Sequence, residues 1–195
     1  MATTKPPRRQ LILEALVDQL EKSPGERITT AALARAAGIS EAALYRHFAS
    51  KAKMFEGLIE FAEESVFTRI NQILEEDRQT RSRCAKIVYL VLAFSARNPG
   101  ITRVLLGDAL VGETGRLHAR VEQFFARLQA KLRQVLREAR MREGGGPEEP
   151  EAAAGLMLAL VEGRMHQFMR TRFATSPLDQ WEAQWRLLEQ SLFPA

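Results

Sequence analysis

The sequence predicts an all-α protein, with an N-terminal three-helix helix-turn-helix domain followed by a C-terminal helical dimerisation domain. Almost every long segment of the 195 residues repeats its apolar side chains near a period of 3.6, and no stretch alternates as a strand would. Glycine and proline interrupt this period where helices would end. The composition, 46% hydrophobic and 27% charged, is that of a chain that can bury a core.

The first four helices are predicted from their apolar faces and their capping residues. The first helix ends before Gly25, which breaks the period. Thr29 and Ser40 are placed to cap a second and a third short helix, and Gly38 supplies the turn between them. Ser50 is placed to cap a longer fourth helix.

Helices are also predicted over the rest of the chain. Residues 81–96 are nearly all apolar at their centre, which predicts a core helix ended by the sequence NPG. A long helix from about 114 to 143 spaces its apolar residues by three and four, as in a coiled-coil seam. Because sustained heptads are few, we favour a helix packed along its own domain. The segment GGGPEEP at 144–150 predicts a loop.

Two apolar stripes near the end of the chain predict either core packing or a homodimer interface. Trp181 and Trp185 lie four residues apart on one helical face. A small helical domain has few other places to bury both stripes, so an interface of four helices from two copies is at least as well supported. The residues assigned to this interface are Leu160, Met165, Phe168, Trp181, Trp185 and Leu188.

The excess positive charge lies in the first quarter of the chain. Residues 1–53 hold nine Lys and Arg against five Asp and Glu, an excess of four, whereas residues 54–195 hold nineteen of each. This asymmetry predicts an anionic partner for the N-terminal segment, and nucleic acid is the leading candidate.

Other classes of protein find little support. Cys84 is the single cysteine, and His47, His118 and His166 are far apart, so no metal site is expected. The two longest uncharged runs are ten residues each, whereas a membrane span needs about 20. The sequence lacks a Gly-rich phosphate loop and a nucleophile elbow. We therefore predict a soluble, cytoplasmic, nucleoid-associated protein that is not an enzyme and carries no cofactor.

Residues 29–48, TTAALARAAGISEAALYRHF, have the proportions of a helix-turn-helix motif. Leu44 and Phe48 face inward, while the opposite face offers donors for phosphate at a capped helix end. With the charge asymmetry, this motif predicts a DNA-binding domain over residues 1–52 and a dimerisation and partner-binding domain over 53–195. The candidate DNA-binding residues are Thr29, Thr30, Ser40, Glu41, Ala42, Tyr45, Arg46, His47 and Lys51.

The motif also resembles a known family. LYRHFASK, following ITTAALARAAGIS, resembles the signature of TetR-type regulators, and the helical remainder resembles their dimerisation domain. Three segments, ERITTAALARAAGISEAALYRHFASKAKMFEGLIEFAEESVFTRIN, RNPGITRVLLGDAL and KLRQVLREARMREG, resemble the nucleoid occlusion factors of that family. The resemblance is close over about residues 8–143 and looser over the last fifty.

The resemblance implies a homodimer that binds a palindromic chromosomal site. It further implies that the DNA-bound form binds the C-terminal tail of the tubulin-like division protein FtsZ and so blocks Z-ring assembly and septum formation over the nucleoid. Thr29 matches the threonine that starts the first motif helix, and Lys51 the lysine that opens the next helix. Tyr45 and His47 match the phosphate-facing pair. The DNA site and the number of dimers that share it are left open.

The same resemblance places an FtsZ groove between the fourth and fifth helices. An apolar anchor with guanidinium partners suits a short, acidic, partly apolar tail. Without the resemblance, an ordinary core phenylalanine and solvated arginines would be the simpler interpretation. Ala93 replaces the glycine of better-known relatives, and its effect on the partner is open. The matching positions are Phe61, Arg69, Leu90, Ala93, Arg97 and Asn98.

One alternative function stays open: a transcriptional repressor released from its DNA by a small molecule. A ligand cavity needs several polar groups that converge among apolar walls. The fifth predicted helix, with IVYLVLAF, offers mainly Tyr89, so the sequence disfavours this alternative.

Overall fold

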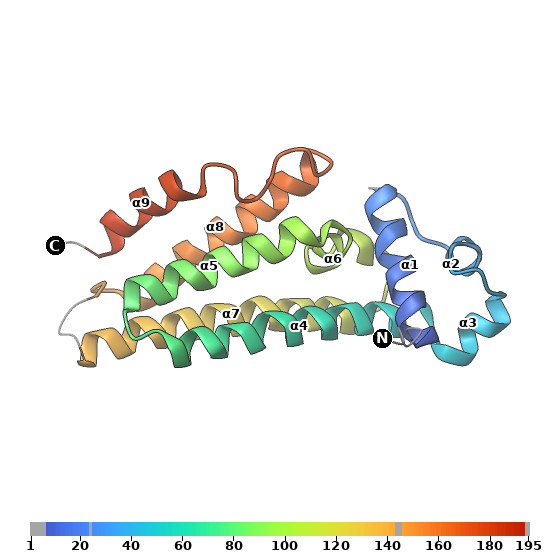
Figure 1. The fold of residues 1–195 in the computed structure, drawn as a ribbon, viewed down its shortest axis with the longest axis horizontal. Helices are drawn as coiled ribbons and strands as arrows, with labels where there is room; N and C mark the ends of the chain where they lie inside the picture. The colour runs from blue at the N-terminus through green and yellow to red at the C-terminus, as the bar shows by residue number, and fades with distance from the viewer. Residues whose placement is uncertain (1–6, 24, 143–145, 194–195) are drawn as a thin grey trace, which may run out of the picture. The chain divides into compact units, whose positions relative to one another are not determined.

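The computed structural model describes residues 7–23, 25–142 and 146–193, where it contains helices and no strand (Figure 1). The predicted all-α class is confirmed. Part of the predicted loop at 144–150 lies outside the described residues, and its last residue, Pro150, already begins a helix. The elements are α1 (Arg8–Lys22), α2 (Thr30–Ala36), α3 (Glu41–His47), α4 (Lys51–Glu76), α5 (Thr80–Arg97), α6 (Pro99–Leu105), the 3₁₀ helix η1 (Asp108–Leu110), α7 (Gly115–Arg142), α8 (Pro150–Arg170) and α9 (Trp181–Leu192).

The chain packs into two compact units that are not continuous in sequence. The first holds the described residues up to Ala62 together with Asn98–Val121, and the second holds Glu63–Arg97 and the described residues from Glu122 onward. The predicted division after residue 52 follows the order of the sequence. Packing instead groups α6 and the first turns of α7 with the N-terminal helices.

In the first unit, α1 contacts α2, α3 and α6. The side chains of Thr29, Ser40 and Ser50 each accept a hydrogen bond from the backbone N–H three residues further on, at 3.1–3.2 Å, which confirms the three predicted caps. Gly38 takes a φ of +64° and makes the predicted turn. The buried core of this unit includes Ile12, Leu16, Leu20, Leu33, Leu44, Phe48 and Phe55.

The contact between α1 and α6, called here the α1–α6 seam, is close and partly polar. A Cβ atom on Gly100 would lie 2.6 Å from the backbone oxygen of Val17, so only glycine allows this approach. Arg103 is 1% exposed, and its guanidinium donates to the backbone oxygens of Leu20 and Ser23, each at 2.8 Å. These two residues fix α6 against the C-terminal end of α1.

In the second unit, α5 contacts α8 and α9. The α7 side chains Phe124, Leu128 and Leu132 are buried within the single chain, which is the arrangement expected of a helix packed along its own domain. Between α8 and α9, the Arg164 guanidinium donates to three backbone oxygens at 2.9–3.1 Å, so this connection has a defined path.

Candidate nucleic-acid interface

Helix α3 presents a polar outer face above a small buried anchor. Leu44 and Phe48 are buried as predicted, and Tyr45 is 46% exposed. The other outward-facing positions predicted from the sequence are also exposed. They are Ser40, Glu41, Ala42, Arg46 and His47. The helix therefore offers a hydroxyl, a guanidinium and an imidazole without giving up its own packing.

The predicted DNA-binding residues Thr30 and Glu41 are joined to each other. The Thr30 hydroxyl donates to Glu41 Oε2 at 2.9 Å, which links the start of α2 to the start of α3. A carboxylate repels phosphate but can accept a hydrogen bond from the amino group of cytosine. This pair therefore suits positioning of the motif, or a base edge, better than a phosphate contact.

The two lysines at the start of α4 are already paired with carboxylates. Lys51 Nζ lies 2.9 Å from Glu113 Oε1, and its side chain lies over the Phe55 ring. Lys53 Nζ lies 2.6 Å from Glu56 Oε2, and this hydrogen bond is the main reason that the pKa of the Glu56 carboxyl is lowered. The positive charge of these lysines is thus largely compensated before any DNA arrives.

Arg9 is a candidate that sequence reasoning missed. Its guanidinium lies 4.5 Å from the centre of the Phe48 ring, which places a cation from α1 at the end of α3. The signal available in the sequence was the pair Arg8-Arg9, one turn before the apolar face of the first helix begins.

The six residues of the predicted partner groove divide between the two compact units. In the second unit, Arg69 and Arg97 are exposed, Leu90 is half-buried, and Arg69 donates to Gln72 Oε1 at 2.9 Å. In the first unit, Phe61 is 49% exposed. Asn98 is half-buried.

Ala93 differs from the other predicted groove residues. It is only 3% exposed, so its methyl group packs within the second unit instead of facing solvent. The Ala93 methyl group is therefore accommodated inside the chain.

The predicted dimer stripes are partly used inside the single chain. Met165, Phe168 and Trp185 are buried, and Trp185 stacks on Trp181 with ring centres 5.4 Å apart. Leu160, Trp181 and Leu188 are half-buried. The large apolar side chains that α8 and α9 expose are Leu156, at 55%, and Leu187, at 68%. Sequence periodicity could not separate these positions from those used in the core.

Two histidines, His118 and His166, and the cysteine show local structural roles. His118 Nε2 lies 3.2 Å from the backbone oxygen of Leu110, and His166 Nδ1 lies 2.9 Å from that of Glu162. Burial raises the pKa of the Cys84 thiol to about 12, which keeps it protonated and unreactive at neutral pH. Within the described ranges, no three His, Cys, Asp or Glu side chains gather as metal ligands would.

A search of the described helices finds none with the length and apolar character needed to cross a membrane.

Two family models match the chain. One, for bacterial regulatory proteins of the tetR family, covers residues 12–58, and one for the tetracyclin repressor-like C-terminal domain covers residues 78–193. Among solved structures, the fatty acid degradation regulator FadR from Bacillus halodurans matches with a TM-score of 0.80 at 15% identity, covering 95% of this chain and 96% of that one. The MbdR regulator from Azoarcus sp. CIB gives 0.80 at 17%, covering 93% and 97%. At such identities the likeness shows the fold alone.

The fold, the helix-turn-helix and the family models define a DNA-binding regulator of the TetR family, not an enzyme. The nucleoid occlusion factor SlmA of Shewanella pealeana is 53% identical over 192 residues, 98% of each chain. The SlmA of Idiomarina loihiensis is 52% identical over 196 residues, the whole of each chain. The chain belongs to this SlmA family of nucleoid occlusion factors.

Proposed function

We propose that this chain works as a DNA-bound homodimer that recognises a palindromic site, binds the C-terminal tail of FtsZ, and so blocks Z-ring assembly and septum formation over the nucleoid. The observation that carries the proposal is the 52–53% identity with nucleoid occlusion factors over 98% or more of the chain. The proposal places the protein in the cytoplasm, associated with the nucleoid.

We assign the DNA contacts to the exposed face of α3 and the capped starts of α2 and α3. Tyr45, Arg46 and His47 are exposed and can donate to phosphate oxygens. Thr29 and Ser40 cap the starts of α2 and α3, where backbone N–H groups without a partner inside the helix can donate to phosphate. Thr30, Glu41 and Ala42 complete the face that approaches the groove. Lys51 contributes less to DNA affinity than its charge suggests, because Glu113 already pairs with it.

We assign the FtsZ contacts to Phe61, Arg69, Leu90, Arg97 and Asn98, with Ala93 supporting Leu90 and Arg97 from within α5. An exposed aromatic side chain can anchor the apolar part of a short peptide. The guanidinium groups of Arg69 and Arg97 are exposed and can bind its carboxylates.

We assign the dimer interface to α8 and α9, with two copies packing as four helices. Leu156 and Leu187 are the most exposed large apolar side chains on these helices, and Leu160, Trp181 and Leu188 are half-buried. Met165, Phe168 and Trp185, which the sequence also assigned to the interface, are buried within the single chain. A Leu187→Glu variant should be monomeric in sedimentation, because a carboxylate cannot be buried unpaired at low cost.

Charge reversal at one arginine tests the FtsZ surface directly. Arg97→Asp should weaken binding of a labelled FtsZ tail peptide by roughly 30- to 150-fold, equivalent to about 2–3 kcal/mol, because it replaces attraction by repulsion. Binding of labelled DNA should stay within about twofold. Arg78→Asp, at another exposed arginine outside the assigned surface, is the matched control and should change neither affinity.

Fluorescence anisotropy measures both affinities on one preparation. Unchanged tail binding in Arg97→Asp would remove this residue from the surface, and equal loss of both affinities would indicate a folding defect. Genome-wide mapping of occupancy supplies the DNA site. Sites scattered over the chromosome but depleted near the terminus support occlusion, whereas one or two promoter sites would favour the ligand-released repressor.

A further inference from the structure

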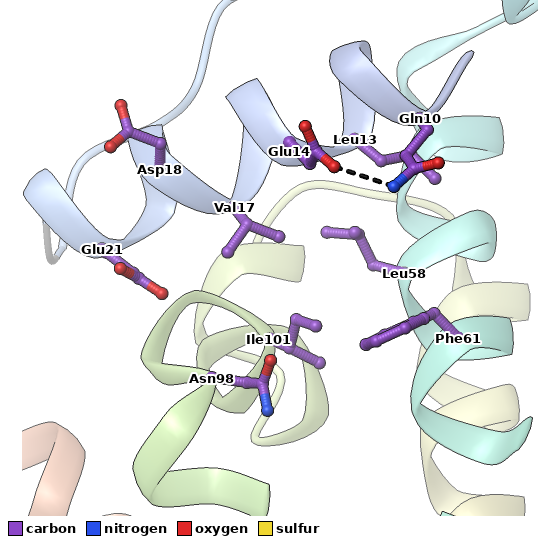
Figure 2. Close-up of a pocket in the computed structure, with 10 residues that line it drawn as sticks. All are labelled: Gln10, Leu13, Glu14, Val17, Asp18, Glu21, Leu58, Phe61, Asn98 and Ile101. Atoms are coloured by element: carbon purple, nitrogen blue, oxygen red, sulfur yellow. Dashed lines mark hydrogen bonds between the residues drawn. The ribbon is translucent and has the colours of Figure 1, made fainter. Parts of the chain in front are cut away.

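A pocket of about 590 Å³ opens in the first unit between α1, α4 and the start of α6 (Figure 2). Its volume lies within the range of roughly 300–1,000 Å³ that holds small organic ligands. It is distinct from the interior of the helical domain, where the sequence offered no convergent polar groups.

The walls of this pocket are apolar and come from three helices. Leu58 of α4 and Ile101 of α6 are each 2% exposed and form a packed floor. Leu13 and Val17 of α1 close one side, and Phe61 stands on the other side with half of its surface accessible (Figure 2). A hydrocarbon or aromatic group bound here would be shielded from water on several sides at once.

The rim along α1 is acidic. Glu14, Asp18 and Glu21 are spaced by four and three residues, so they follow one face of the helix. Asp18 is neutralised by Lys22, whose Nζ lies 2.7 Å from Asp18 Oδ1. Glu14 accepts a hydrogen bond from a neutral amide, that of Gln10, at 2.9 Å (Figure 2).

The charge of two of these carboxylates is therefore available to a ligand. Across the part of the chain that the structure describes, neither Glu14 nor Glu21 has a basic side chain within ion-pair distance. Glu14 is exposed and Glu21 is half-buried at the edge of the apolar walls, so a ligand that covers the pocket would exclude water near these carboxylates and strengthen their attraction to its positive charge.

We propose that this pocket binds a lipophilic organic cation, with its hydrocarbon body on Leu13, Val17, Leu58 and Ile101 and its positive charge toward the acidic rim that Glu14 and Glu21 form along α1. This site goes beyond the proposed function. It uses α1, which the FtsZ surface does not, although Phe61 and Asn98 border both. Because the ligand touches both sides of the α1–α6 seam, its binding stabilises the packing of the first unit.

Two ions of the same shape and opposite charge test the proposal on the full-length protein without DNA or FtsZ. Tetraphenylphosphonium should bind, measured by calorimetry, at least about tenfold more tightly than tetraphenylborate, and it should raise the unfolding temperature. Backbone amide signals of Val17 and Ile101 should shift in NMR spectra as the cation is added.

A charge-neutral double variant supplies the specificity control. Glu14→Gln with Glu21→Gln keeps size and fold but should weaken tetraphenylphosphonium about tenfold. Glu122→Gln with Glu182→Gln removes the same net charge at exposed positions outside the pocket and should leave binding unchanged. Equal binding of the two ions, or full affinity in the Glu14/Glu21 variant, would overturn the proposal.

Discussion

Helices α3 and α6 are each seven residues long, yet they are held by opposite means. Only Leu44 of α3 is buried, and the helix depends on a cap and a turn close to it in sequence. In α6, every residue from Gly100 to Leu105 is buried, and the helix depends on contacts with a segment about eighty residues earlier. A short helix held by local contacts therefore leaves its outer face free to bind a partner, whereas a short helix held by distant contacts is buried along its length.

The largest effect is expected where α6 is tied to α1. Arg103→Met removes donors to the backbone oxygens of Leu20 and Ser23 and leaves Asp108 without its partner. We expect a loss of about 3–5 kcal/mol in the free energy of unfolding, measured by urea denaturation. Arg46→Met, the exposed arginine of α3, should change stability by no more than about 0.5 kcal/mol. Similar values for the two variants would remove the contrast between the helices.

A steric change at the same seam should have the next largest effect. Gly100→Ala places a methyl group 2.6 Å from a backbone oxygen of α1, and backbone cannot move aside as a flexible side chain can. We expect a loss of about 1–3 kcal/mol. Gly115→Ala, where the new methyl group meets nothing within 4 Å, should be neutral or slightly stabilising. The unfolding temperatures of both variants measure this difference. An unchanged unfolding temperature for Gly100→Ala would mean that α1 and α6 can move apart without loss of stability.

The exposed arginine of α3 and the paired lysine of α4 should differ in how much they contribute to the salt dependence of DNA binding. Arg46→Ala should flatten the dependence of log affinity on log salt by about one unit, the value expected for one lost phosphate contact. Lys51→Ala should change the slope less, because Glu113 already neutralises the lysine. Anisotropy titrations over a range of salt measure both slopes. A larger change for Lys51→Ala would show that its pair with Glu113 opens on DNA.

The smallest effect is expected at a surface pair of the second unit. The pKa of the Asp77 carboxyl lies well below its ordinary range. The main cause is a hydrogen bond from Lys86, and a second hydrogen bond, from Ser82, adds to it. A lowered folded-state pKa stabilises the protein above the unfolded value, near about pH 4, and this contribution is lost as the pH falls toward the folded value. Lys86→Met should cost about 0.5–1 kcal/mol at neutral pH and reduce the acid sensitivity of unfolding. Equal pH profiles for both proteins would contradict this.

The predictions from sequence succeeded where the cause is local. A helix cap bonds a residue three positions away, and a glycine turn depends on one residue. The roles of Thr29, Ser40 and Gly38 could therefore be predicted from the sequence. The exposed face of α3 followed from the helical period. Nothing in the sequence indicates that Lys51 pairs with Glu113 or that Arg103 donates to Leu20, because only the fold brings these partners together.

For a related reason, the sequence could not decide whether the apolar stripes on α8 and α9 belong to the core or to a dimer interface. Periodicity identifies an apolar face but does not say whether that face meets the same chain or a second copy. Trp185 is covered within the chain, whereas Leu187, two residues away, is exposed. Leu156 and Leu187 are therefore the sharper tests of the interface, and neither is among the residues assigned to it from the sequence.

The measurement that bears most directly on the central proposal is the affinity of the wild-type chain for the FtsZ tail, with and without its DNA site. The tail peptide should bind more tightly to the DNA-bound protein than to the free protein, since occlusion requires the inhibitor to act on the nucleoid. No tail binding in the presence of DNA would contradict the account and leave a DNA-binding regulator whose partner is not FtsZ.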